Sequence, residues 1–209
     1  MKKIIVSTLL AMAAVASFAQ GTINVGSGIT STRFPIYGPQ VGSEGIQTVG
    51  SSSLSAPAGS TVYTGGLLSG ARYAIEFWAG PSSATDFSGL TLITATTFRT
   101  GATATSLPNG ITLTTASAVP GVPAGLTAKL GVRVWDTQSG ATFALASVRG
   151  AGALFLSAGL GGIDGGGNPV LSPNWVGQSF SIAAVPEPTS MALAGIGAAS
   201  LLIFRRRNK

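Results

Sequence analysis

The clearest pattern in the chain is an alternation of apolar and polar side chains over two short stretches, residues 72–80 (RYAIEFWAG) and 129–136 (KLGVRVWD). A period of two residues is typical of a β-strand with one buried face. The apolar side chains that share a face are Tyr73, Ile75 and Phe77 in the first stretch, and Leu130, Val132 and Val134 in the second. Both stretches are therefore predicted to be strands of the core.

Further strand-like segments, separated by turn residues, follow the same logic. They lie at residues 90–100, 111–119, 141–150, 153–159 and 178–185, and residues 136–140 (DTQSG) have the composition of a hairpin loop that leads into 141–150. Gly, Pro and Thr interrupt every stretch that could form a long helix between residues 20 and 184. The pattern therefore predicts an all-β domain, an antiparallel β-sandwich or jelly roll.

The opposite faces of the two alternating stretches carry the most distinctive chemistry of the body. Arg72, Glu76 and Trp78 share one such face, and Lys129, Arg133 and Trp135 share the other. An exposed indole beside hydrogen-bonding groups is one way in which proteins hold sugar rings, so we consider Trp78, Trp135, Glu76 and Arg133 as candidate sugar contacts. The alternative, which we favour, is that each tryptophan packs over the sheet or under a loop.

The first nineteen residues have the three parts of a secretory signal peptide. Lys2 and Lys3 precede an apolar run from Ile4 to Val15, and small residues then lead to a predicted cleavage after Ala19. An uncleaved membrane helix is the alternative. We favour cleavage because the apolar run is shorter than the roughly twenty residues that cross a bilayer.

The last residues form a second apolar run, from Met191 to Phe204, that ends at Arg205, Arg206 and Arg207. As a helix it would measure about 21 Å, short for a hydrocarbon core of about 30 Å, although a strained span is plausible. Arginines beside a span stay on the cytoplasmic side, so we expect the body to face outward. A buried core helix is the alternative, but the arginines and the small residues of the run argue against it.

Together with Val185-Pro186-Glu187-Pro188, this run resembles the PEP-CTERM sorting signal of bacteria that make exopolysaccharide. The resemblance implies that an integral-membrane exosortase recognises Pro186, Glu187 and Pro188 and processes the chain for transfer to the surface or matrix. Prolines keep such a segment extended and available to a processing enzyme. The middle of the chain is similar to the β-rich bodies that often precede this tail, which implies no activity.

The composition excludes several classes of function. Half of the twelve basic residues lie at the two ends, and between residues 20 and 184 six basic against five acidic residues leave a net charge of +1, too little for a nucleic-acid footprint. The chain has no Cys and no His, which removes disulfides, thiol nucleophiles, catalytic triads and the usual zinc sites.

Other catalytic or metal chemistry has little support in the sequence. Glu76 and Asp136 are the carboxylates that we weigh as a glycan-hydrolase pair, but the sequence gives no reason to pair them. Asp164 is the only carboxylate in a glycine-rich loop at residues 159–174, which we read as a solvated loop in preference to a calcium site. We expect no catalytic residue, metal or cofactor.

These observations divide the chain into a signal peptide (residues 1–19), a β-sandwich extracellular domain (20–184) and a sorting signal (185–209). We expect an exported structural protein of the cell surface or exopolysaccharide matrix. It would be held in the inner membrane by its C-terminal helix, at least transiently, and processed by an exosortase-type enzyme. The alternative function is a carbohydrate-binding surface module with extracellular polysaccharide as its partner. We expect no nucleic acid and no enzyme activity.

Overall fold

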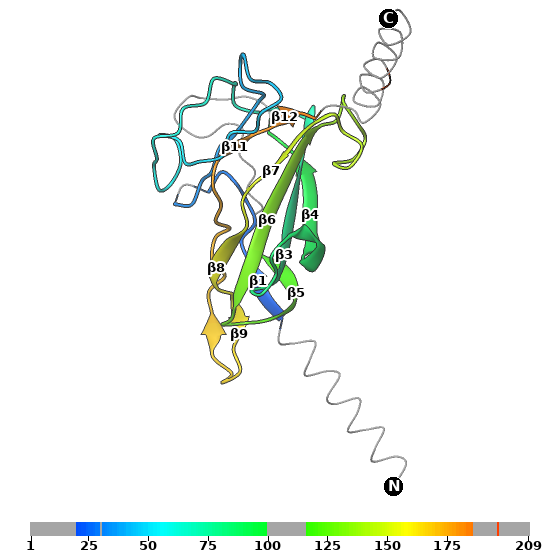
Figure 1. The fold of residues 1–209 in the computed structure, drawn as a ribbon. Helices are drawn as coiled ribbons and strands as arrows, with labels where there is room; N and C mark the ends of the chain where they lie inside the picture. Colours follow the sequence, from blue (N-terminus) through cyan, green and yellow to red (C-terminus); the bar gives the residue numbers. More distant parts are fainter. Residues whose placement is uncertain (1–19, 30, 100–115, 186–195, 197–209) are drawn as a thin grey trace, which may run out of the picture.

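The computed structural model of the chain describes residues 20–29, 31–99, 116–185 and 196 (Figure 1). Within these residues no helix is long and apolar enough to cross a membrane. The two flanking helices predicted from the sequence, the cleavage site at Ala19, the motif Pro186-Glu187-Pro188 and the cluster Arg205–Arg207 lie outside the described residues.

A six-stranded sheet lies at the centre of the β body. Its strands follow the order β12-β7-β6-β3-β4, and β8 also pairs with β6. The strands are β3 (Tyr73–Pro81), β4 (Thr91–Thr97), β6 (Thr127–Asp136), β7 (Val148–Ala151), β8 (Phe155–Gly159) and β12 (Ala183–Ala184). All the pairs in this sheet are antiparallel. The predicted all-β, antiparallel character is thus confirmed.

The two alternating stretches of the sequence are the central strands β3 and β6, which run side by side in Figure 1. They pair without a break from Tyr73 opposite Asp136 to Pro81 opposite Ala128. Because directly opposed residues share a face, this register places Ile75 and Phe77 beside Val134 and Val132, and all four are buried. The face predicted to be apolar is therefore the core face.

Short strand pairs and irregular segments cover the core face. The pairs are β1 (Gln20–Ile23) with β5 (Ser117–Pro123), β2 (Ile36–Tyr37) with β11 (Phe180–Ser181), and β9 (Gly162–Ile163) with β10 (Pro169–Val170). Trp175, which is fully buried, packs its ring against Phe77 with centroids 5.1 Å apart. Among the described residues, each of the sheets other than the six-stranded one has only two strands. The predicted sandwich is therefore not confirmed.

Hydroxyl groups hold the long connection between β2 and β3 against the body. Ser52 accepts a hydrogen bond from the Tyr37 hydroxyl (2.8 Å), and the Ser55 and Ser179 hydroxyls are 2.7 Å apart. Tyr63 stacks on Tyr37 with ring centroids 4.0 Å apart and donates to the carbonyl oxygens of Gly50 and Ser179. These buried hydroxyls are satisfied by one another and by backbone, as burial requires.

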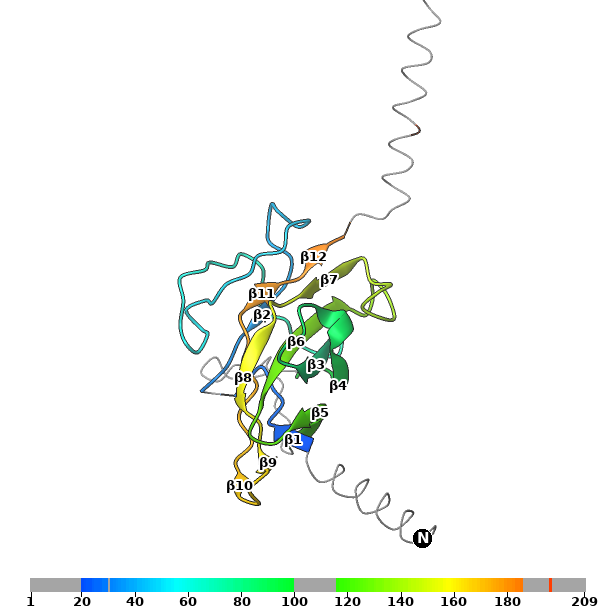
Figure 2. The same cartoon turned by 60° about the horizontal axis from the view of Figure 1, so that its bottom comes forward.

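The first and last described strands lie at opposite ends of the body (Figures 1 and 2). Strand β1 begins at Gln20, and β12 ends at Ala184. Backbone bonds fix this exit: the Ala184 amide donates to the Glu44 carbonyl and the Val185 amide to the Ser147 carbonyl, both at 2.7 Å. The described body therefore ends one residue before Pro186.

Tyr63 makes the stability of this body sensitive to alkaline pH. Burial raises the pKa of Tyr63 to about 12, against about 10 for an unfolded tyrosine. The folded state holds the phenolic proton more tightly, so its contribution to stability is complete below about pH 10 and is lost as the pH rises to about 12. We predict that urea unfolding midpoints will fall between pH 9 and pH 11.5, and that Tyr63→Phe will reduce this fall.

The same substitution should lower the free energy of unfolding at pH 8 by about 1 kcal/mol, because it removes a shared hydrogen bond. Tyr73→Phe is the matched control, since it leaves Tyr63 in place and should keep the alkaline loss. An equal alkaline loss in Tyr63→Phe and in the native chain would contradict the role assigned to Tyr63.

Candidate functional site on the outer face of the sheet

The face of β3 and β6 opposite the core, called here the outer face, carries the residues that the sequence analysis selected. In the register, Glu76 lies directly opposite Arg133 and Trp78 opposite Gly131. The Trp78 indole Nε1 donates a hydrogen bond to a Glu76 carboxylate oxygen at 2.9 Å. Glu76, Trp78 and Arg133 therefore form one group of neighbours.

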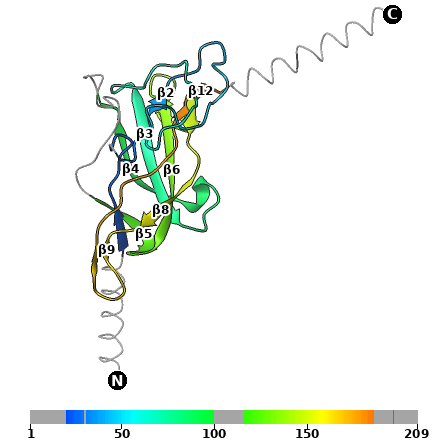
Figure 3. The same cartoon turned by 90° about the vertical axis from the view of Figure 1, so that its left-hand side faces the viewer.

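A loop between β3 and β4 lies on this outer face because two glycines leave room for it. A Cβ atom on Gly131 would come within 2.7 Å of the Phe87 ring, and one on Gly80 within 2.8 Å of the Gly89 carbonyl oxygen. In the side view of Figure 3, this loop projects from the side of β6 opposite to β1. The two glycines thus allow the loop to approach the sheet closely.

Asp86 fixes the conformation of that loop. Its side chain caps the short 3₁₀ helix η1 (Phe87–Gly89) by accepting hydrogen bonds from the Ser88 amide (2.8 Å) and hydroxyl (2.6 Å). These hydrogen bonds, the one from the hydroxyl above all, hold the pKa of Asp86 below its ordinary value. The cap holds the Phe87 ring edge-to-face with Trp78, with centroids 6.4 Å apart.

The loop between β6 and β7 brings a second ring to the outer face. Arg149 donates hydrogen bonds to the carbonyl oxygens of Phe143 and Ala144. Its guanidinium also lies 5.3 Å from the centroid of the Phe143 ring. Phe143 in turn packs edge-to-face with Trp135, at 6.5 Å between centroids. Arg149 therefore pins the part of the loop that presents Phe143.

Asp136 anchors the start of the same loop. It is 4% exposed and forms an ion pair with Arg72, whose Nη2 and Nε donate to one carboxylate oxygen at 2.7 and 3.0 Å. The other oxygen accepts from the Gln138 amide at 3.0 Å. The hydrogen bond from Arg72 to Asp136 raises the pKa of Arg72. The buried carboxylate is thus paired, as burial of a charge requires.

Arg133 is surrounded by three aromatic rings. The centre of its guanidinium lies 4.2 Å from the ring centroid of Phe87, 4.9 Å from that of Phe143 and 5.0 Å from that of Trp78. These distances fall within the range of a cation–π interaction. The Arg133 Nε is buried and has no hydrogen-bond partner among the described residues. We call Arg133 and these three rings the arginine cage.

The four candidate residues therefore differ in position and exposure. Glu76, Trp78 and Arg133 are neighbours, and both Trp78 and Arg133 are partly exposed. Trp135 is 6% exposed because Phe143 and the β6–β7 loop cover it. This agrees with the favoured interpretation of a tryptophan packed under a loop, and Trp135 is not available as a sugar contact.

Sequence reasoning missed both Phe87 and Phe143. Phe87 lies in a turn-forming segment, and Phe143 lies in residues 141–150, which were predicted to be a strand although the strand β7 begins only at Val148.

The two carboxylates weighed as a hydrolase pair do not face each other. Asp136 lies opposite Tyr73 in the register, on the face of Ile75, whereas Glu76 is on the outer face. Each also has a partner already: Asp136 binds Arg72, and Glu76 binds the Trp78 indole. Asp164 accepts hydrogen bonds from the Gly166 and Asn168 amides in its own turn. In the described part of the chain no three potential metal-ligating side chains gather.

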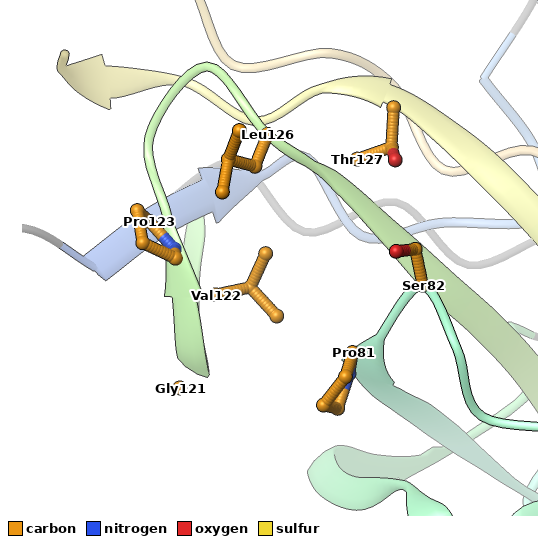
Figure 4. Close-up of a pocket in the computed structure, with 7 residues that line it drawn as sticks. All are labelled: Pro81, Ser82, Gly121, Val122, Pro123, Leu126 and Thr127. Carbon is orange, nitrogen blue, oxygen red and sulfur yellow. The ribbon is translucent and has the colours of Figure 1, made fainter. Parts of the chain in front are cut away.

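Two hollows lie elsewhere on the body. Figure 4 shows one of about 220 Å³ near the end of β3, where Pro81 and Ser82 lie across from Val122 and Leu126. The other, of about 350 Å³, lies beside Tyr63 and the serines of the β2–β3 connection. Neither is lined by a charged side chain.

We predict that Gly131→Ala will displace Phe87 from the cage. The new methyl group would overlap both Phe87 and Leu154, whose Cδ2 would lie at 2.8 Å. Overpacking of this kind typically costs about 1–3 kcal/mol. The measurement is the urea unfolding midpoint, together with the near-ultraviolet circular dichroism of the tryptophans.

Gly165→Ala is the matched control, because a Cβ at Gly165 would meet no atom within 4 Å. It should leave both signals unchanged. An unchanged spectrum and midpoint in Gly131→Ala would show that Phe87 does not depend on this glycine.

Comparison with known proteins adds information about the C-terminus. Residues 184–207 match the family described as the PEP-CTERM protein-sorting motif. No curated protein and no solved structure gives a significant match. The matched segment begins at Ala184, the last residue of β12. The chain thus carries a PEP-CTERM protein-sorting motif, which implies exosortase-dependent sorting of an exported protein to the surface.

Proposed function

We propose that this chain is an exported structural protein of the cell surface or exopolysaccharide matrix, and that it is delivered through its C-terminal sorting signal. The motif match at residues 184–207 is the observation that carries this proposal. The signal peptide predicted at residues 1–19 provides the corresponding entry into the export route. In this proposal the two ends of the chain are targeting signals, and the β body is the part that is delivered.

The position of the motif favours processing of an already folded body. The last described backbone bonds of the body are donated by Ala184 and Val185. Pro186 and Pro188 have no amide hydrogen and cannot continue this ladder. The motif residues Pro186, Glu187 and Pro188 would therefore be available to an exosortase-type enzyme without unfolding of the sheet.

The proposed route includes a transient stay in the inner membrane. The apolar run from Met191 to Phe204 would enter the bilayer, and the cluster from Arg205 to Arg207 would remain on the cytoplasmic side. The body would then face outward before its transfer to the surface or matrix. Whether the run is removed or retained decides between release and anchoring.

A non-enzymatic role fits the chemistry of the body. The chain has neither His nor Cys. Glu76 and Asp136 lie on opposite faces of the sheet, and both are engaged in side-chain interactions. We therefore propose that the body works through its surface and its stability.

We predict that the mature surface form has lost residues 1–19, and its mass will show whether the C-terminal run is removed as well. Its mass should be lower than the 20.7 kDa of the full chain, and its first residue should be Gln20. Intact-mass spectrometry and N-terminal sequencing of the surface fraction would check this. Recovery of the full-length chain, or of a form that keeps residues 1–19, would contradict the proposed route.

We also predict that Glu187→Gln will reduce surface delivery, because it removes the one carboxylate of the motif while keeping its prolines. Deletion of residues 186–209 should abolish delivery. Glu44→Gln is the matched control, since Glu44 is an exposed carboxylate of the body. Cell fractionation followed by immunodetection measures the outcome. Equal surface delivery of the native chain and of the deletion would refute the sorting role.

A second candidate function, binding of carbohydrate on the outer face, is favoured by one observation. Glu76, Trp78 and Arg133 are brought together there from two adjacent strands. A polar group beside aromatic rings suits a polyhydroxylated ligand. Trp135, being buried, takes no part in this version of the proposal.

A further inference from the structure

Within the described part of the chain, the Arg133 side chain differs from those of its neighbouring arginines in having no hydrogen-bond acceptor. Arg72 is paired with Asp136, and Arg149 donates to two backbone carbonyl oxygens. Among the described residues the Arg133 side chain forms no hydrogen bond or ion pair, and its buried Nε is without a partner. A guanidinium carries five donors and stays charged at all ordinary pH values. Within the described body, the guanidinium of Arg133 thus makes cation–π contacts with the three rings of the cage.

The nearest candidate partner inside the protein is already engaged. Glu76 lies directly opposite Arg133 in the register, and such a cross-strand pair of opposite charges usually interacts. Here the Glu76 carboxylate accepts from the Trp78 indole at 2.9 Å, and among the described residues it forms no ion pair with Arg133. The side chains of Glu76 and Arg133 therefore lie on neighbouring strands without an ion pair between them.

The cage is rigidly held, so an incoming group would find the guanidinium in place. Phe87 is positioned by the Asp86 cap and by the space above Gly131. Phe143 is positioned by the hydrogen bond from Arg149 to its carbonyl oxygen. Since the residue as a whole is partly exposed while its Nε is buried, its exposure comes from other atoms. A preorganised donor loses little entropy when a ligand binds.

We propose that Arg133 binds a carboxylate group of an acidic polysaccharide. The planar fork of a guanidinium matches a carboxylate with two parallel hydrogen bonds. This inference deepens the second candidate function and rests on the proposed placement of the body outside the cell, where it would meet such a polymer.

The test is binding of the purified full chain, kept in a mild detergent, to three polymers. Affinity electrophoresis compares polygalacturonate, which carries carboxylates, with dextran sulfate and with neutral dextran. We expect retention by polygalacturonate, weaker retention by dextran sulfate and none by dextran. Arg133→Gln should weaken binding to polygalacturonate by at least about tenfold, the effect of one charged hydrogen bond. Arg133→Lys should also weaken it, because an ammonium lacks the fork.

Lys129→Gln is the matched control. Lys129 lies on the same strand and on the same face, four residues from Arg133, and its loss changes the net charge of the chain equally. It should leave binding nearly unchanged. Near-ultraviolet circular dichroism verifies that each variant is folded.

A measurement on the native chain alone guards against variants that do not fold. Polygalacturonate should change the tryptophan fluorescence, since Trp78 borders the cage, whereas dextran should not.

Three results would overturn the inference. The first is equal retention of the native chain by polygalacturonate and dextran. The second is retention by dextran sulfate that exceeds retention by polygalacturonate, and the third is an equal loss of binding in Lys129→Gln and Arg133→Gln. All three are measured on isolated protein and do not depend on delivery in the cell. Failure of the sorting proposal and failure of carboxylate binding are therefore separate outcomes.

Discussion

The unbroken register between β3 and β6 is the constraint on which the other features of the body depend. One pairing places Phe77 opposite Val132 in the core and Glu76 opposite Arg133 on the outer face. A slip of one residue would exchange the two faces and move the apolar side chains into solvent. Burial of residues such as Ile75 and Val134 therefore fixes the relative positions of the outer side chains. The packing of the hydrophobic core therefore determines the geometry of the arginine cage.

The outer face is completed by loops, and each loop is tied down by polar contacts of its own. Asp86 caps η1, and Asp136 joins Arg72 to the start of the β6–β7 loop. The Arg72 side chain is 53% exposed, so its ion pair contributes modestly to stability compared with a buried pair. Its more definite effect is positional, because it neutralises a buried carboxylate that orders the loop. The loop ordered in this way carries Phe143, which packs against Trp135.

Alternation in the sequence predicted which side chains share a face, but it could not predict how deeply each is covered. Trp78 and Trp135 were both placed on the outer face, and both lie there. Trp135 is buried because Phe143, from a loop, packs on it. Loop conformations depend on tertiary contacts such as the close approach of Phe87 to Gly131, which no periodicity records. The two-residue strand β2 is likewise too short to leave a pattern, whereas its parallel partner β11 lies in the segment 178–185 that the sequence predicted to be a strand.

The sorting motif and the body supply different kinds of functional information. The motif is a linear signal at residues 184–207, and it was visible in the sequence because it is defined by the order and spacing of its residues. A linear signal of this kind can follow many different bodies, so it does not determine what the delivered domain binds. That question has to be answered from the side chains that the fold brings together. Among the described residues the buried Nε of Arg133 has no acceptor, while the residue as a whole is partly exposed and its guanidinium is held among three rings. This arrangement is the strongest chemical argument that the outer face has a ligand.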